Sequence, residues 1–171
     1  MQKISRIPSG APWEPIFGYS RVVRAGDWVA VSGTTSFDER GLIIGPGQMY
    51  VQARQAIGNV AAALERAGAG LADVVRTRVF VTDITRFGEV ARAHQERFGA
   101  NPPASTAVEV RRLVHPDMLV EIEADAYVPS SGSAVKVQPA EVAAGAAKPK
   151  ASGKPAPARK AAPRKPARKR R

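Results

Sequence analysis

The alternation of side chains between residues 102 and 128 constrains the fold of this chain most strongly. From residue 118 to residue 127 every second position is apolar, and three of the positions between them are Glu121, Glu123 and Asp125. A period of two predicts a β-strand with one buried face. Like charges on one face repel, so the acidic face either meets water or holds a partner that compensates one of the carboxylates.

A second strand is expected just before this one, because Val108 and Val110 alternate with Glu109 and Arg111. Residues 115–117, His-Pro-Asp, supply turn chemistry, since proline fixes φ and aspartate can hydrogen-bond its own backbone. The stretch is therefore expected to form two strands joined by a turn.

Two amphipathic helices and three more strands are expected upstream. Residues 48–67 and 84–98 place apolar side chains three and four positions apart, the pattern of a helix with one buried stripe. Gly68 or Gly70 is expected to end the first helix in the left-handed conformation. The remaining strands are expected at residues 17–24, 28–34 and 75–83, with a tight hairpin turn at Ala25, Gly26 and Asp27.

The resulting order, β-β-α-β-α-β-β, favours an α+β fold with both helices on one face of a mixed sheet. Residues 1–16 contain Pro8, Pro12 and Pro15, and no helix is expected there because proline blocks helix propagation. A domain of roughly 125 residues has a modest core, which favours self-association through the other face of the sheet.

The net charge of +11 lies entirely near the C-terminus. Residues 1–129 contain 14 Lys and Arg and 14 Asp and Glu, whereas residues 130–171 contain 12 Lys and Arg and the single acid Glu141. We expect a domain over residues 1–129, a flexible linker over 130–147 and a disordered tail over 148–171, because the Ala/Pro/Lys/Arg-rich tail has no aromatic or large aliphatic residue.

A flexible cation of this kind neutralises phosphates without reading bases. Nucleic acid or another polyanion is therefore an expected partner of residues 148–171, and the alternative is a solubilising appendage with no specific partner. A membrane partner is not expected, because no large apolar residue that could insert into a bilayer accompanies the charge.

Composition excludes several kinds of site. No Cys is present, which excludes disulfides and thiolate nucleophiles, and the two histidines stand 21 positions apart, so neither a metal nor a cofactor is expected. The chain has no apolar run long enough to span a membrane and no signal-peptide core, so a cytoplasmic protein is expected.

Five side chains are considered as candidates for chemistry. Glu121, midway along its strand, could position a water or accept a proton, and the alternative is a solvated charge on an edge strand. Tyr19 and Ser32 offer hydroxyls, although each alone is more typical of ordinary packing or hydrogen bonding. His94 lies on an apolar helical stripe and is expected to be a satisfied interior or interface residue, while His115 is expected to be exposed.

Several short segments carry a family resemblance: Gly18-Tyr19-Ser20, Val31-Ser32-Gly33, residues 52–56 with Asn59, Val79–Asp83, the run from Pro103 to Val110, and Val120–Ala124. Over about residues 4–128 the chain resembles the YjgF/RidA family, the reactive-intermediate imine deaminases. The resemblance implies a chorismate-mutase-like α+β domain that forms a homotrimer with three clefts between subunits. It also implies that Tyr19, Ser32, Gly33 and Glu121 line the cleft and that Glu121 holds the water that attacks an imine carbon.

One departure from the family pattern concerns the substrate. The deaminase branch has the motif Pro-x-Arg-Ser, whose arginine makes a bidentate contact with the substrate carboxylate. This chain has Ser105 at the position of that arginine. Ala107 stands where a Cys is common, and Ala91 where the family has a site Asn. Arg111 or Arg112 is a candidate replacement, although strand alternation would send only one of them to a given face. The chain therefore resembles the branches that lack the arginine, with Ser105 and Ala107 at substrate-binding positions.

Two functions follow as alternative hypotheses. The first is hydrolysis of an imine or enamine other than the usual 2-imino acids, in a cleft between subunits. The second is a non-catalytic module that binds a small molecule and is tethered to nucleic acid by its basic tail.

Overall fold

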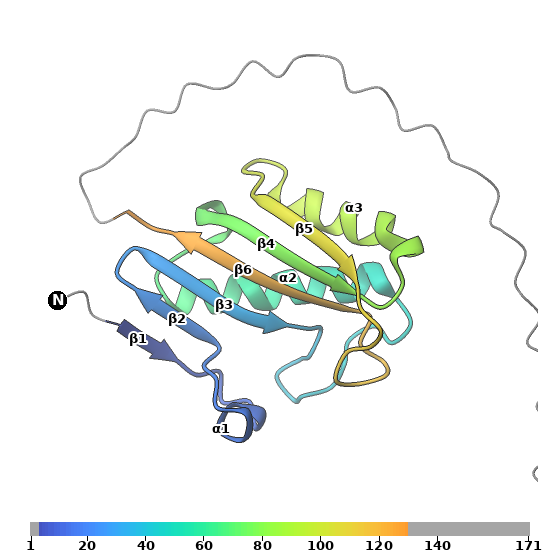
Figure 1. Ribbon diagram of the computed structural model, residues 1–171, viewed down its shortest axis with the longest axis horizontal. Coiled ribbons are helices and arrows are strands. Elements are labelled where there is room, and N and C mark those ends of the chain that lie inside the picture. The colour runs from blue at the N-terminus through green and yellow to red at the C-terminus, as the bar shows by residue number, and fades with distance from the viewer. Residues whose placement is uncertain (1–3, 130–171) are drawn as a thin grey trace, which may run out of the picture. The chain divides into compact units, whose positions relative to one another are not determined.

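A computed structural model describes residues 4–129, which form a six-stranded sheet and its helices (Figure 1). The strands are β1 (Ile4–Ile7), β2 (Val22–Ala25), β3 (Trp28–Thr34), β4 (Val74–Val81), β5 (Ala104–Glu109) and β6 (Val120–Tyr127). The helices are α1 (Trp13–Phe17), α2 (Met49–Arg66) and α3 (Phe87–Phe98), with the 3₁₀ turns η1 (Leu71–Asp73) and η2 (Ile84–Arg86). The predicted linker and basic tail, residues 130–171, lie outside the described residues.

The sheet is mixed, as the α+β prediction requires. Its order is β1-β2-β3-β6-β4-β5, in which only the β4–β5 pair is parallel. Figure 1 shows α2 and α3 on the same side of the sheet, so the prediction of two helices on one face is confirmed. The strand that carries Glu121 lies in the middle of the sheet, between β3 and β4, and the alternative of a charge on an edge strand is therefore wrong.

The core lies between the sheet and the two long helices. Val120 and Ile122 of β6 are fully buried, as are Ile57 and Leu64 of α2. Along β6 buried and partly exposed residues alternate without interruption from Val120 to Ala126. The apolar positions therefore face the helices and the acidic positions face the other way, as the period of two predicts.

The two strands at the C-terminal end of the domain are not neighbours. β4 lies between β5 and β6, and residues 110–119 connect them. The predicted turn is present within this connection, where Met118 N donates to the carbonyl of His115 at 3.1 Å, and His115 is exposed as expected.

The N-terminal leader is more ordered than its prolines suggest, and the prediction for it is wrong. Ile4–Ile7 adds an edge strand, and Trp13–Phe17 forms a short helix with Pro12 at its N-cap and Pro15 in its first turn. The first N–H groups of a helix have no intrahelical partner, so proline is tolerated there. Gly18 ends this helix at φ 77°, and the predicted strand at 17–24 therefore shortens to Val22–Ala25.

Two predicted turns are confirmed. Gly26 and Asp27 join β2 to β3, with Ala25 paired to Trp28. Gly68, at φ 72°, follows the end of α2 in the left-handed conformation that glycine adopts without strain.

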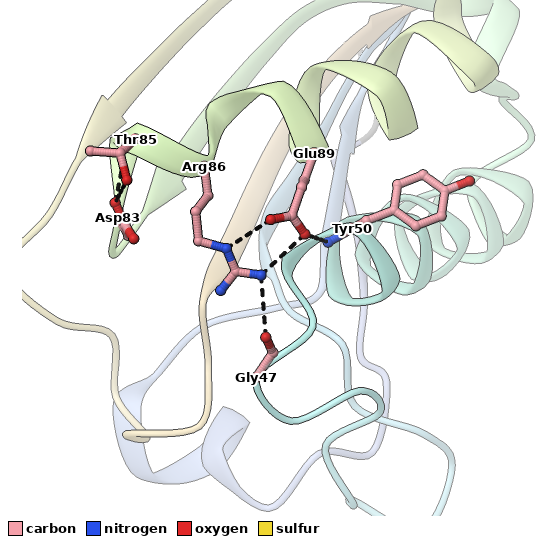
Figure 2. A network of polar contacts seen from close by, with 6 residues as sticks. All are labelled: Gly47, Tyr50, Asp83, Thr85, Arg86 and Glu89. Atoms are coloured by element: carbon pink, nitrogen blue, oxygen red, sulfur yellow. Dashed lines mark hydrogen bonds and ion pairs between the residues drawn. The ribbon is translucent and has the colours of Figure 1, made fainter.

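A polar junction fixes α3 against the start of α2 (Figure 2). Arg86 donates to Glu89 through Nε (2.7 Å) and Nη2 (3.1 Å), and Nη2 also donates to the carbonyl of Gly47 at 3.2 Å. Glu89 in turn accepts from the backbone N–H of Tyr50 at 3.2 Å. Because the first N–H groups of α2 need partners from outside the helix, Glu89 supplies a cap that the sequence of α2 itself lacks.

Candidate functional site

Glu121 differs from the other two carboxylates on its face of β6. Arg78 of β4 pairs with Glu123 at 3.4 Å and with Asp125 at 3.2 Å, which compensates both. Within the part of the chain that the structure describes, the side chain of Glu121 has neither an ion pair nor a hydrogen bond. Burial, and then the nearby charge of Glu123, raise the pKa of Glu121 above its ordinary value of 4.5, while the charge of Arg21 opposes them.

Glu121 lies against a β-bulge in the neighbouring strand. Val31 of β3 pairs with Ala124 and Thr34 pairs with Ile122, so three steps on β3 match two on β6. A Cβ on Gly33, within this bulge, would collide with Oε1 of Glu121 and stand only 3.0 Å from its Cδ. Any side chain at this position would therefore move the carboxylate, which gives Gly33 a physical role beside Glu121.

Arg21 holds the bulge together, and sequence reasoning did not identify it as a site residue. Its Nη1 donates to the carbonyl of Gly33 at 2.7 Å and to Thr34 Oγ1 at 3.0 Å, and its Nη2 donates to the hydroxyl of Tyr19 at 3.0 Å. The one sequence signal was its spacing of two from Tyr19 in an extended segment. Arg21 therefore links Tyr19 and Gly33, and its charge acts on Glu121.

The two predicted hydroxyl residues, Tyr19 and Ser32, belong to the same set of contacts around the bulge, but their hydroxyl groups make different hydrogen bonds. Tyr19 is half-buried, and its ring makes an edge contact with Phe17 at 6.0 Å. Ser32 donates its hydroxyl proton to the carbonyl of Ser20 at 2.8 Å, so its oxygen remains only as an acceptor. We call Tyr19, Arg21, Ser32, Gly33 and Glu121 the Glu121 group.

Ser105 and Ala107 belong to a second group. Thr77 Oγ1, fully buried on β4, donates to Ser105 Oγ at 2.9 Å and lies 3.0 Å from His94 Nε2. Ser105, Ala107, Ala91 and His94 line a groove of about 260 Å³ between α3 and β5. The three positions at which the chain departs from the expected family pattern therefore lie together. We call this the α3–β5 groove.

The two groups occupy opposite faces of the sheet in one copy of the chain. Glu121 alternates with the buried Val120 and Ile122 and so faces away from the helices. Ser105 bonds Thr77, which contacts His94 of α3 and so lies on the helical face. The groups are also separated along the sheet, because β4 lies between β6 and β5 (Figure 1).

The candidate replacements for the arginine lie elsewhere. Arg111 and Arg112 follow β5 in the exposed connection to β6, so the expectation that strand alternation would orient them is wrong. Neither residue lines the α3–β5 groove.

Residues 4–129 contain neither a candidate metal site nor a candidate membrane-spanning helix. No three His, Asp or Glu side chains come close enough together to hold a metal ion. No helix in this range has the length and apolar character that crossing a membrane requires.

Comparison with known proteins gives consistent similarities. A family model described as endoribonuclease L-PSP matches residues 10–128. A Streptomyces coelicolor protein, named only as uncharacterized, is 37% identical over 126 residues, which are 74% of this chain and 93% of that protein. A RutC family protein of Pyrococcus horikoshii is 39% identical over 114 residues, covering 67% of this chain and 90% of that protein.

Solved structures show the same fold. A Mycobacterium tuberculosis member of the YjgF/YER057c/UK114 family is 46% identical and superposes with a TM-score of 0.68. The match covers 74% of this chain and 100% of that chain. RidA from an Antarctic Psychrobacter is 30% identical with a TM-score of 0.63, over 75% of this chain and 100% of that chain.

Proposed function

The chain belongs to the YjgF/RidA family, and on that premise we propose that it forms a homotrimer whose inter-subunit clefts hydrolyse a small imine or enamine other than the usual 2-imino acids. The observation that carries this proposal is the state of Glu121. It is a half-buried carboxylate with a raised pKa and, among the described residues, no compensating partner. Perturbed ionisable groups of this kind cluster at functional sites.

Glu121 supplies the proton transfers that hydrolysis of a C=N bond needs. The carboxylate would take a proton from water as the water oxygen bonds to the imine carbon, and would pass that proton to the imine nitrogen, which gives a neutral carbinolamine. The carboxylate would then take the proton of the carbinolamine hydroxyl and pass it to the nitrogen as the C–N bond breaks, so that an amine leaves with the bonding electron pair and a carbonyl compound remains. A raised pKa favours this exchange, because a base and acid work best when their pKa lies near the working pH.

A second copy of the chain brings the two groups to one ligand. In a single copy the Glu121 group and the α3–β5 groove lie on opposite faces of the sheet, so they cannot contact the same small molecule. In a homotrimer the Glu121 group of one subunit would face the groove of the next. The open face of the sheet also carries Trp28 and Tyr127, which are 45% and 46% exposed and available for burial between subunits.

Release of ammonia from freshly generated 2-iminopropionate tests the substrate proposal. The protein should show little activity, because Ser105 cannot replace a charged pair worth about 1.5–3 kcal/mol, or roughly 10- to 150-fold in binding. Ser105→Arg is the matched variant and should gain activity on this substrate. Wild-type turnover equal to that of a RidA deaminase would overturn the proposal.

Replacing Glu121 tests the mechanism separately. Glu121→Ala should abolish hydrolysis of any imine that the protein turns over and should leave assembly intact, as measured by light scattering. Glu123→Ala is the control, because Glu123 lies on the same face but pairs with Arg78. Unchanged turnover in Glu121→Ala would remove this residue from the chemistry.

The alternative function is a non-catalytic small-molecule-binding module that its basic tail tethers to nucleic acid. The observation that favours it is the +11 charge of residues 130–171 beside a neutral domain. The protein should then retard DNA at low salt and lose this effect as salt rises, because binding releases counterions. Truncation after Gly132 should abolish retardation, and equal retardation by the truncated protein would contradict a role for the tail.

A further inference from the structure

The α3–β5 groove has apolar walls and a buried floor. Val79, Val90 and Phe98 are at most 3% exposed and form its base, while Phe87, 41% exposed, stands at its rim. A cavity of about 150 Å³ is enough to hold benzene. The groove, at about 260 Å³, therefore has room for one ring with a short substituent.

Hydrogen bonds among Thr77, His94 and Ser105 present the Ser105 hydroxyl to this space, whose lining also includes the polar residue Gln95. Thr77 donates its hydroxyl proton to Ser105 Oγ at 2.9 Å, and its oxygen lies 3.0 Å from Nε2 of His94. Ser105, exposed and accepting from Thr77, keeps its own hydroxyl proton for an external acceptor. The groove thus offers a hydrogen-bond donor whose orientation is set by a fully buried threonine.

The groove is also uncharged. Its lining contains no Lys, Arg, Asp or Glu. Burial lowers the pKa of His94 below its ordinary value of 6.5, so the imidazole is neutral at pH 7, and its ring packs on Phe98 at 4.5 Å. A carboxylate placed here would lose its water without gaining a cation, which is unfavourable.

We propose that the α3–β5 groove binds the uncharged end of a small ligand, namely one ring or a compact branched chain that carries a carbonyl or hydroxyl oxygen. Ser105 donates to that oxygen, and Val79, Val90 and Phe98 contact the apolar part. The inference deepens the proposed function and rests on it for the link to catalysis, since it names the substrate class as neutral imines or enamines with an apolar group.

Benzamide and benzoate test this directly, because they share a shape and differ in charge. Each is titrated into the full-length protein at pH 7, and backbone amide shifts are followed by NMR. Benzamide should shift amides within residues 87–99 and 105–107, and benzoate should bind about tenfold more weakly or worse. Equal or tighter binding of benzoate, or no shift in the groove up to the solubility limit of benzamide, would overturn the proposal.

Two variants of Ser105 sharpen the result. Ser105→Ala removes the donor and should weaken benzamide binding about three- to tenfold, whereas Ser105→Arg should reverse the preference in favour of benzoate. If Ser105→Arg fails to fold, Ser105→Ala still decides, since unchanged benzamide affinity there would refute the role of the hydroxyl. No turnover is measured, so a protein that binds benzamide but hydrolyses no imine would lose the proposed reaction and keep the groove.

Discussion

Replacing Arg21 tests whether the bulge and Glu121 form one unit. Its guanidinium makes three hydrogen bonds of 3.0 Å or less, to Gly33, Thr34 and Tyr19. Hydrogen bonds to a charged group contribute about 1.5–3 kcal/mol each. Because Arg21 is only half-buried, water replaces part of these bonds, and Arg21→Ala should lower the free energy of unfolding by about 2–4 kcal/mol.

The effect of Arg21 on Glu121 is separable from its effect on stability. Arg21→Lys keeps a positive charge near Glu121 but loses the planar fork that reaches both Tyr19 and Gly33. The charge of Arg21 holds down a pKa that burial raises. Arg21→Ala should therefore raise the pKa of Glu121 further, and Arg21→Lys should leave it close to the wild-type value while still costing stability.

Urea unfolding gives the free energies, and an NMR titration of the glutamate side-chain carboxyl carbons gives the pKa. An unchanged pKa of Glu121 in Arg21→Ala would refute the electrostatic link. Unfolding free energies equal to wild type in both variants would refute the structural one.

Two further substitutions probe the same region, and a third, Gly58→Ala in α2, is their control. Gly33→Ala should push the carboxylate of Glu121 towards water and return its pKa towards 4.5 in the same titration, whereas Gly58→Ala, whose Cβ meets nothing within 4 Å, should leave that pKa unchanged and raise stability by about 1 kcal/mol. The raised pKa of Glu121 means that the folded protein holds the proton of this carboxyl more tightly than the unfolded chain does. The stability of the fold therefore decreases as the pH rises from 4.5 through the pKa of Glu121 in the folded protein. Glu121→Gln should therefore be more stable than wild type at pH 7 and lose this advantage below pH 4.5, and a constant difference across pH in thermal melts would contradict the raised pKa.

Most of the fold could be predicted from the sequence, because the strongest sequence patterns arise from the burial of apolar side chains. Alternation along β6 predicted its two faces, and the helical stripes predicted α2 and α3 to within a few residues. The leader was misread because Pro12 and Pro15 exclude a helix interior but not a first turn. The carboxylate of Glu14 also fixes this segment, since it accepts hydrogen bonds from Ser9 and Gly10. The spacing of apolar residues along the sequence does not predict contacts of this kind.

The site was less predictable, because it depends on which strands become neighbours. The alternation of side chains does not distinguish Glu121 from Glu123 and Asp125. They differ because Arg78, on the neighbouring strand β4, compensates the charges of Glu123 and Asp125. The role of Arg21 likewise requires the pairing of β2 with β3. The separation of Ser105 from Glu121 follows from the insertion of β4 between β5 and β6, which local sequence does not specify.

The most direct test of a cleft shared between subunits uses the absence of native cysteine. Tyr19→Cys and Ser105→Cys are prepared separately, mixed by unfolding and refolding together, and treated with a short bismaleimide. A shared cleft predicts a covalently linked pair of chains on a denaturing gel in the mixture, well above the amount that either variant gives alone. Linked pairs that are absent from the mixture, or no more abundant there than in the separate variants, would contradict the assignment of Glu121 and Ser105 to one cleft.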